Sequence, residues 1–142
     1  MKTFKNIPIF PLKSIILPGG QFPLRIFERR YLDMTRECLK NDKGFVIALT
    51  KRDSDYISSV YDYASYVEIV DWSQLDGGLL GITVEGKNIV KLNNYALDES
   101  NLLKGDASEI ECGVDYLVPQ KYQILSKFYK KIYPEIKAYI FH

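Results

Sequence analysis

Short apolar segments separated by polar turns make up most of the chain up to residue 111. Segments of four to eight residues that alternate in polarity, or that are all apolar, are typical of β-strands. We expect strands at residues 7–12, 22–26, 45–50, 63–70, 79–84, 89–97 and 106–111. Pro8 and Pro11 cannot donate a ladder hydrogen bond, so the first segment is predicted to be an edge strand or to be flanked by bulges. The continuous apolar run at 45–50 predicts a strand in the middle of a sheet.

Turns are predicted between several of these segments. Asp76-Gly77-Gly78 is a turn signal, because glycine adopts backbone conformations that other residues resist. Glu85-Gly86-Lys87 predicts a further turn, so that the strands before and after it would form a hairpin. The polar residues 51–62 predict a loop or the tip of a hairpin.

The segment from residue 28 to about residue 41 is predicted to be an amphipathic helix. Apolar residues recur there at positions i, i+4, i+7 and i+11, which places them on one face: Phe27, Tyr31, Met34 and Cys38. A second helix is predicted over residues 119–142, with an end or kink near Pro134.

Length and composition favour a compact fold. The chain has 142 residues, of which 46% are apolar and 26% charged, and these values are ordinary for a globular protein. Several short, mostly antiparallel strands with an early and a late helix make an α+β fold, and a small half-open barrel buries so many short strands most economically. We therefore expect one domain over residues 1–118, with a C-terminal helical extension, residues 119–142, packed on it.

Few side chains that commonly serve in catalysis or metal binding are present. The chain contains 11 Tyr and 7 Phe, but only one His, one Trp and two Cys. His142 is the last residue, which excludes a triad that depends on His and a metal site with several His. Cys38 and Cys112 are far apart in the sequence and are predicted to be free thiols. This composition favours binding over catalysis, and we expect no catalytic residue, no metal and no cofactor.

Charge and hydropathy narrow the choice of partners. The formal net charge is only +1, whereas nucleic-acid binding usually draws on a basic excess. The first twenty residues contain lysines near the start, but prolines interrupt their apolar run and no signal-peptide cleavage pattern follows. No segment is long and apolar enough to span a membrane. We therefore predict a cytoplasmic protein without membrane contact.

Two blocks of sequence resemble the N-terminal domain of Lon proteases. The first is Ile7-Pro8-Ile9-Phe10-Pro11-Leu12 together with residues 17–31, LPGGQFPLRIFERRY, and it is similar to the family's run of (I/L)P(I/L)FPL, then LPG, then PL-x-IFE-x-RY. The second is Val70-Asp71-Trp72 together with residues 76–86, DGGLLGITVEG. The resemblance covers about residues 6–111 and includes the stand-alone bacterial proteins that carry this domain alone.

The resemblance implies a PUA-like pseudo-barrel with helices packed at its side. In full-length Lon proteases this domain is associated with recognising substrate polypeptides and with oligomer assembly. The chain contains no GxxxxGK[ST] phosphate loop and leaves no room for the ATPase and Ser–Lys peptidase domains. We therefore expect a non-enzymatic polypeptide-binding module that resembles the substrate-recognition domain of ATP-dependent Lon protease.

The candidate binding residues surround the turn at residues 18–20 and the start of the first predicted helix. We predict that a peptide is contacted by Pro18, Phe22, Arg25, Glu28 and Arg29, through apolar contact and strand addition at an exposed sheet edge. A structural interpretation stays open: the apolar residues can close the end of a small barrel, and Glu28 can interact with the helix N-terminus while an Arg pairs with a nearby carboxylate. The predicted partners are unfolded or extended polypeptide segments, with a protease, a chaperone or a second copy of the chain as further candidates.

Two other functions stay open from the sequence. Tyrosine and lysine are interleaved from residue 116 on, and aromatic stacking combined with basic charge is how proteins bind single-stranded nucleic acid. An RNA-binding protein with a PUA-like fold is therefore the alternative hypothesis. The same residues also suit an amphipathic helix that packs on the domain or self-associates. The third option is an enzyme acting on a small ligand, for which the sequence indicates no acid–base pair.

Overall fold

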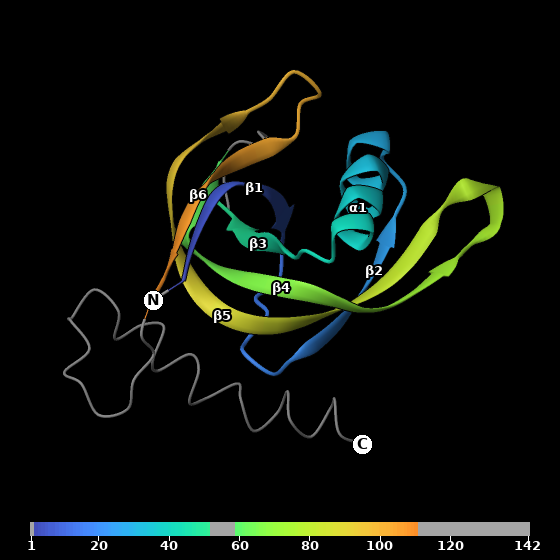
Figure 1. Cartoon of the computed structure of the whole chain (residues 1–142), viewed down its shortest axis with the longest axis horizontal. Helices are drawn as coiled ribbons and strands as arrows, with labels where there is room; N and C mark the ends of the chain where they lie inside the picture. The colour runs from blue at the N-terminus through green and yellow to red at the C-terminus, as the bar shows by residue number, and fades with distance from the viewer. Residues whose placement is uncertain (1, 52–58, 111–142) are drawn as a thin grey trace. The chain divides into compact units, whose positions relative to one another are not determined.

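The computed structural model describes residues 2–51 and 59–110, which are coloured in Figure 1. Their elements are β1 (Thr3–Leu12), β2 (Gln21–Ile26), α1 (Arg29–Asn41), β3 (Phe45–Thr50), β4 (Val60–Gln74), the short 3-10 helix η1 (Asp76–Gly78), β5 (Leu80–Leu97) and β6 (Leu103–Glu109). All of these elements belong to one compact unit, Met1–Glu111. The predicted C-terminal helix and the predicted boundary at residue 118 lie outside the described residues. No helix in the described part is long and apolar enough to cross a membrane.

Five of the strands close into a barrel. The order in the sheet is β2-β5-β4-β3-β1-β6, and β6 also pairs with β5, so that β5, β4, β3, β1 and β6 form a ring (Figure 1). All pairings are antiparallel except that of β1 with β3. The remaining strand, β2, pairs with the first part of β5 outside the ring. The predicted α+β pseudo-barrel of mostly antiparallel strands with an early helix is thereby confirmed.

The predicted strands are present, and several of them begin earlier or end later than expected. β3 lies between β4 and β1, and four of its six residues are buried, which confirms the predicted central strand. β4 extends the strand predicted at 63–70 in both directions. The predicted turn at residues 76–78 is confirmed as η1. Of the loop predicted at 51–62, residues 52–58 lie outside the described part.

One long strand stands where the sequence predicted a hairpin. β5 runs without a break through Glu85-Gly86-Lys87, so the turn predicted there is wrong. Gly86 is buried, and a Cβ at this position would lie only 2.3 Å from the backbone oxygen of Leu17. Its backbone accepts a hydrogen bond from Gly19 N–H and donates one to the Gly20 carbonyl. This glycine is therefore required for the close approach of two backbones and not for a change of chain direction.

β1 is not an edge strand, which was one of the two predictions made from its prolines. It lies between β6 and β3, but β6 pairs with its first part and β3 with its last part, and only Ile9 pairs with both. Pro8 and Pro11 therefore each lie beside a single neighbouring strand, where a missing donor is tolerated. The predicted bulge is present as a register shift between Phe4 and Ile7.

Two apolar cores hold the domain together. The first contains residues of the barrel strands, including Ile9, Val46 and Leu103, which have no exposed surface. The second packs α1 against the side of the sheet and includes Phe45 and Ile26. The second core fixes the position of β2 and of the start of α1, where the candidate binding residues lie.

The helix α1 begins and ends where its periodicity predicted, and Glu28 is its N-cap residue. Tyr31, Met34 and Cys38 are buried against the sheet, as the apolar spacing indicated. Phe27 was expected on the same face, but this prediction is wrong, because its side chain is 65% exposed. Phe27 precedes the N-cap residue, so the helical repeat does not govern its direction.

Candidate functional site

Three strand segments project from the barrel and form an arm, which consists of residues 21–26 of β2, 68–74 of β4 and 80–85 of β5. The β5 segment lies between the other two, and Figure 1 shows the hairpin of β4 and β5 at the right, beyond α1. Within the described residues, β2 pairs only with β5, and β3 pairs with β4 only as far as Val67. As far as the structure describes the chain, the arm therefore has two free edges, one on β2 and one on β4.

The two faces of the arm differ. Side chains of β2 and β5 that point toward α1 are buried in the second core, among them Leu24 and Ile82. On the opposite face lies a shallow groove of about 330 Å³ that crosses all three strands. The strand register places these lining residues on that face: Pro23, Thr83 and Asp71 in one row, and Arg25, Gly81 and Ser73 in the next.

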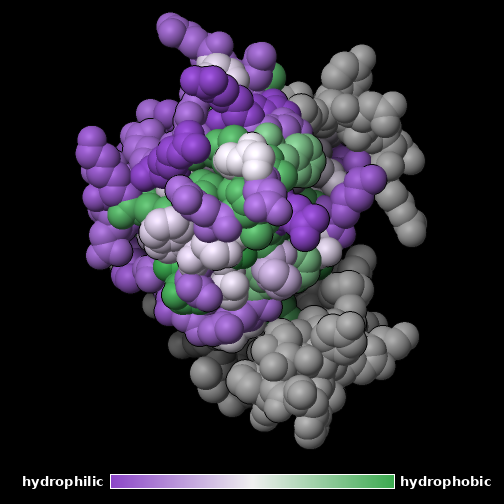
Figure 2. Space-filling view, turned by 90° about the vertical axis from the view of Figure 1, so that its right-hand side faces the viewer, coloured by the Kyte–Doolittle hydropathy of each residue, from purple (hydrophilic) through white to green (hydrophobic). Residues whose placement is uncertain are grey.

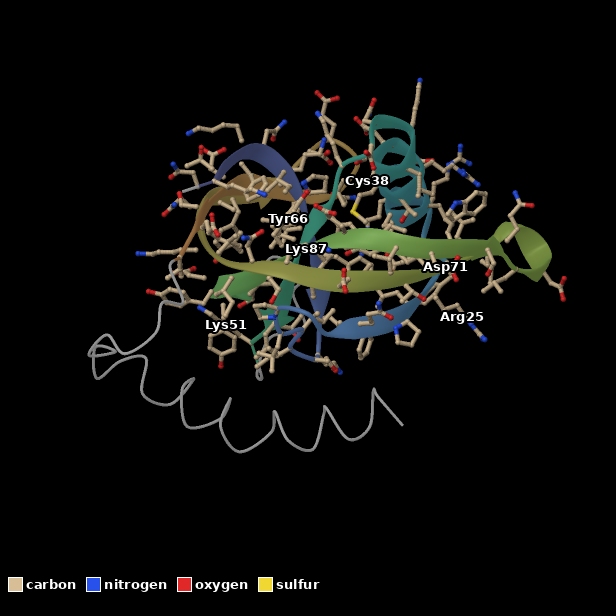
Figure 3. All side chains as sticks on the ribbon, turned by 60° about the horizontal axis from the view of Figure 1, so that its bottom comes forward. Arg25, Cys38, Lys51, Tyr66, Asp71 and Lys87 are labelled. Carbon is tan, nitrogen blue, oxygen red and sulfur yellow. The ribbon has the colours of Figure 1, made fainter. Side chains whose placement is uncertain are left out.

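Arg25 and Asp71 are the charged residues that line this groove. Both are exposed, and in Figure 3 they lie at the same end of the arm, on β2 and on β4. Gly81 lies between their strands, and a Cβ added to it would come within 3.4 Å of Ser73 Oγ. The missing side chain therefore keeps the floor of the groove open between a cationic and an anionic residue.

The predicted site residues at the start of β2 have different surroundings. Pro18 is exposed and forms an isolated bridge with Gly86 of β5. Phe22 is half-buried and packs against the second core, which is the structural interpretation that its sequence position left open. The turn predicted at residues 18–20 is confirmed by the hydrogen bond from Gly20 N–H to the Leu17 carbonyl.

The charged residues at the start of α1 divide into a paired and an exposed group. Glu28 Oε2 accepts hydrogen bonds from Arg30, with Nε at 2.8 Å and Nη2 at 2.7 Å, and Glu28 makes no side-chain capping bond. Arg30 Nη1 also donates to the Asn101 carbonyl at 2.8 Å, and its guanidinium lies 4.8 Å from the centre of the Tyr31 ring. The side chain of Arg29, by contrast, is 92% exposed. Arg30 therefore pairs with a nearby carboxylate, as the structural interpretation allowed, and ties α1 to the loop between β5 and β6, while Arg29 projects into solvent.

The five predicted residues follow β2 from one end to the other. Pro18 and Phe22 lie at its start, Arg25 lies near its end, and Glu28 and Arg29 follow it. A strand rises about 3.3 Å per residue, so Phe22 and Arg25, three residues apart on β2, are separated by roughly 10 Å along the strand. The structure thus places these residues along one free edge and brings only Arg25 into the groove.

Sequence reasoning named Val70 and Trp72 of β4 in the second block of resemblance but did not assign them to the candidate site. Trp72 is 52% exposed and Val70 is 46% exposed, and Val70 lies in a register shift between Ile69 and Asp71. Their exposure was not predicted because the strand predicted from the sequence ended at Val70, whereas β4 continues to Gln74. A Trp directly after an Asp in an otherwise polar segment is the signal that could have found them. Figure 2 shows this side of the molecule, where apolar residues gather in the centre and hydrophilic residues surround them.

Some titratable groups near the arm are engaged in contacts within the molecule. Lys87 Nζ donates to Glu85 Oε2 at 2.6 Å, and this hydrogen bond lowers the pKa of Glu85 and raises the pKa of Lys87. Burial beneath α1 raises the pKa of the Cys38 thiol to about 11, so the thiol is protonated at neutral pH. Within residues 2–51 and 59–110, His, Cys, Asp and Glu form no group of three that could hold a metal ion. The arrangement therefore offers edges, apolar surface and fixed charges for contact with a ligand.

The closed ring of strands with an arm and a packed helix defines a domain of the PUA-like pseudo-barrel class. The family model of the ATP-dependent protease La (LON) substrate-binding domain matches residues 6–140, and the chain belongs to this family. The resemblance seen in the sequence is thereby confirmed. The match also continues beyond residue 111, where the sequence blocks ended.

Solved structures are similar to this chain over most of its length. The Lon N-terminal domain protein from Xanthomonas campestris is 26% identical, with 93% of this chain and 73% of that chain covered and a TM-score of 0.67. The N-terminal domain of the Mycobacterium avium complex Lon protease is 17% identical, with 96% of this chain and 68% of that chain covered and a TM-score of 0.58, and it shares the fold. No match was found among curated protein sequences.

Proposed function

We propose that this protein is a non-enzymatic module that binds extended or unfolded polypeptide segments. The observation that carries the proposal is the outer edge of β2, Gln21–Ile26, which among the described residues pairs with β5 on one side only. An extended peptide that adds to such an edge gains main-chain hydrogen bonds, and these depend little on its sequence. Membership in a family whose model describes a substrate-binding domain supports the same function.

Side chains beside the β2 edge provide the contacts that flank the added strand. Pro18 offers apolar surface at one end, while Arg25 and Arg29 offer positive charge at the other. Glu28 is engaged by Arg30 and positions the start of α1. Pro23 lacks a backbone N–H, so the strand offers fewer donors than its length would allow. We therefore expect weak binding of short segments with little sequence preference.

We propose that a separate protein, a protease or a chaperone, acts on the bound polypeptide. The matching family model describes the substrate-binding part of an ATP-dependent protease, which favours a protease as this partner. Co-purification from the native cell with identification of the bound proteins tests the proposal. Recovery of an ATP-dependent protease would support it, and recovery of nucleic acid alone would favour the RNA-binding alternative.

A nuclear magnetic resonance titration tests the location of the β2 site. The isotope-labelled full chain is titrated with a short uncharged peptide of alternating Leu and Ser, and we expect amide shifts concentrated in residues 18–31. R29A should weaken binding about threefold, because the guanidinium of Arg29 would donate to a carbonyl of this peptide and one such hydrogen bond contributes about 0.5–1.5 kcal/mol. R36A is the matched control, since Arg36 is an exposed arginine farther along α1. Saturable binding with no shift at residues 18–31 would contradict this placement.

A further inference from the structure

The β4 edge of the arm differs from the β2 edge in its backbone and in its exposed side chains. It consists of residues 68–74, in which β5 is the only described strand that pairs with β4. This segment contains no proline, so every residue keeps its backbone N–H, and that of Trp72 donates to Asp71 Oδ1 at 2.9 Å. Val70 and Trp72 are 46% and 52% exposed, although large apolar side chains on a strand are usually covered. Among the described residues, the edge is thus open to hydrogen bonding except at the Trp72 N–H, and it has an aromatic side chain on it.

The charges on the β4 edge are all negative. Glu68, Asp71 and Asp76 lie on it or directly beyond it and are exposed, and the chain has no Lys or Arg between residues 52 and 87. The basic residues that approach this part of the sheet come from its other strands, where Lys87 is held in an ion pair within β5 and Arg25 lies across the groove on β2. The two edges of the arm therefore carry opposite charge.

The register of β4 with β5 separates the acidic and the aromatic side chains of this edge. Glu68 and Asp71 pair with Glu85 and Thr83, so they lie on the face away from α1, while Trp72 pairs with the buried Ile82 and lies on the other face. A strand added to β4 alternates in the same way. A segment with basic residues at every second position would therefore place its positive charges beside the carboxylates and its apolar residues beside the indole.

We propose that the β4 edge is a second binding site, which takes an extended polypeptide segment in which Lys or Arg alternates with apolar residues. Main-chain hydrogen bonds to residues 68–74 hold the segment, and the carboxylates of Glu68 and Asp71 select its charge. The indole of Trp72 provides apolar contact and attracts any cation that reaches its face. This site lies across β5 from the proposed β2 site and differs from it in the charge of the ligand that it accepts.

Intrinsic fluorescence reports directly on this site, because Trp72 is the single tryptophan of the chain. The full chain is titrated with a short peptide of alternating Lys and Val at low salt, and we expect a shift of the tryptophan emission to shorter wavelength as the indole is covered. A peptide of alternating Ser and Val should bind less tightly, and one of alternating Glu and Val should bind least. The same Lys–Val peptide with N-methyl groups on alternate backbone nitrogens should lose binding, since it cannot form the ladder.

Variants separate this site from the β2 site. E68Q/D71N should weaken the Lys–Val peptide about threefold to tenfold at low salt, and the difference should shrink at high salt because exposed charges are screened. The matched control E37Q/E99Q removes two exposed carboxylates elsewhere and should bind as the wild type does. R29A should weaken the uncharged peptide at β2 and leave the Lys–Val titration unchanged.

The outcomes are decisive in either direction. An unchanged Trp72 emission at saturating Lys–Val peptide, or equal affinity for the Glu–Val peptide, would overturn the proposal even if binding at β2 is found. Where E68Q/D71N fails to fold, the salt dependence of the wild-type affinity replaces it: affinity that falls with salt for the Lys–Val peptide and not for the Ser–Val peptide supports the site. Equal salt dependence for the two peptides would refute it.

Discussion

Replacement of Arg30 by alanine should destabilise the domain far more than replacement of its neighbour Arg29. The Arg30 side chain is only 15% exposed and holds two parts of the fold, since it donates to Glu28 at the start of α1 and to the Asn101 carbonyl in the loop between β5 and β6. Arg29 is 92% exposed, and its closest carboxylate oxygen, on Asp33, is 3.9 Å away. The pair provides adjacent arginines with different structural roles.

The expected loss for R30A can be worked from these contacts. The ion pair with Glu28 contributes about 0.5–1 kcal/mol, because the Glu28 side chain is 44% exposed and water screens the pair. The hydrogen bond to the Asn101 carbonyl adds about 0.5–1.5 kcal/mol, and the contact with the Tyr31 ring adds about 0.5–1 kcal/mol. We expect a loss of about 2 kcal/mol for R30A and of less than about 0.5 kcal/mol for R29A.

Urea denaturation of both variants at neutral pH measures these losses. If the slope of the unfolding free energy against urea concentration is the same for both variants, they unfold between comparable states and their stabilities can be compared. R30K should recover less than half of the loss, because an ammonium cannot reach Glu28 and the Asn101 carbonyl with the geometry of a guanidinium. Native-state hydrogen exchange should show faster exchange in the β5–β6 loop for R30A and not for R29A.

The same two variants separate structural from ligand-contacting arginines. Folded R30A should keep the affinity of the β2 site for an uncharged peptide within about twofold, whereas R29A should lose about threefold with the loss of one hydrogen-bond donor. Losses of stability that agree within about 0.3 kcal/mol for R30A and R29A would refute the role assigned to Arg30. A larger binding loss for R30A than for R29A, with the fold intact, would show that Arg30 contacts the ligand.

Three further measurements test the fold. G86A should cost about 3 kcal/mol in urea denaturation, because its Cβ would lie 2.3 Å from a backbone oxygen, whereas G81A, with no neighbour closer than 3.4 Å, should cost less than about 1 kcal/mol. In a C112S background, Cys38 should be alkylated at pH 8 at least about 100-fold more slowly in the folded than in the unfolded protein, since burial raises its pKa to about 11. A hydrogen bond from the Ser100 hydroxyl lowers the pKa of Asp98, so its stabilising effect is complete above the ordinary value of 3.8 and is lost as the pH falls through the folded-state pKa. The difference in melting temperature between wild type and D98N should therefore shrink when the pH is lowered from neutral toward 3.

Local sequence patterns predicted those helices and strands in which buried residues recur at a regular spacing. The apolar spacing of Tyr31, Met34 and Cys38 predicted α1, because a helix on a core must repeat its buried face every three to four residues. The same reasoning was wrong for Phe27. This residue precedes the first helical turn, where the helical repeat does not determine which way a side chain points. Gly86 was misread for a related reason, because a close approach of two backbones, unlike a turn, leaves no signal in the neighbouring residues.

Candidate site residues could be predicted from the sequence where they lie in one continuous segment. They could not be predicted where their position depends on the pairing of strands in the sheet. Pro18, Arg25 and Arg29 were identified because they lie in a single stretch that resembles a known family. Trp72 and Asp71 reach the other edge of the arm only through the pairing of β4 with β5, including two register shifts that no local pattern indicates. The opposite charge of the two edges is likewise a property of the sheet order and not of any one segment.

The continuity of β5 through Gly86 connects the fold with both proposed sites. The barrel uses the second part of β5, which pairs with β6, and the first part extends beyond it to pair with β2 and the end of β4. Had the chain turned at Glu85-Gly86-Lys87, β2 and the end of β4 would have no common strand to pair with, and neither edge would be presented on the arm. Substitution of Gly86 should therefore weaken binding of the uncharged and of the Lys–Val peptide together, whereas substitutions on one edge affect one peptide only. A folded G86A variant that loses one of the two activities alone would show that the two edges do not depend on a shared strand.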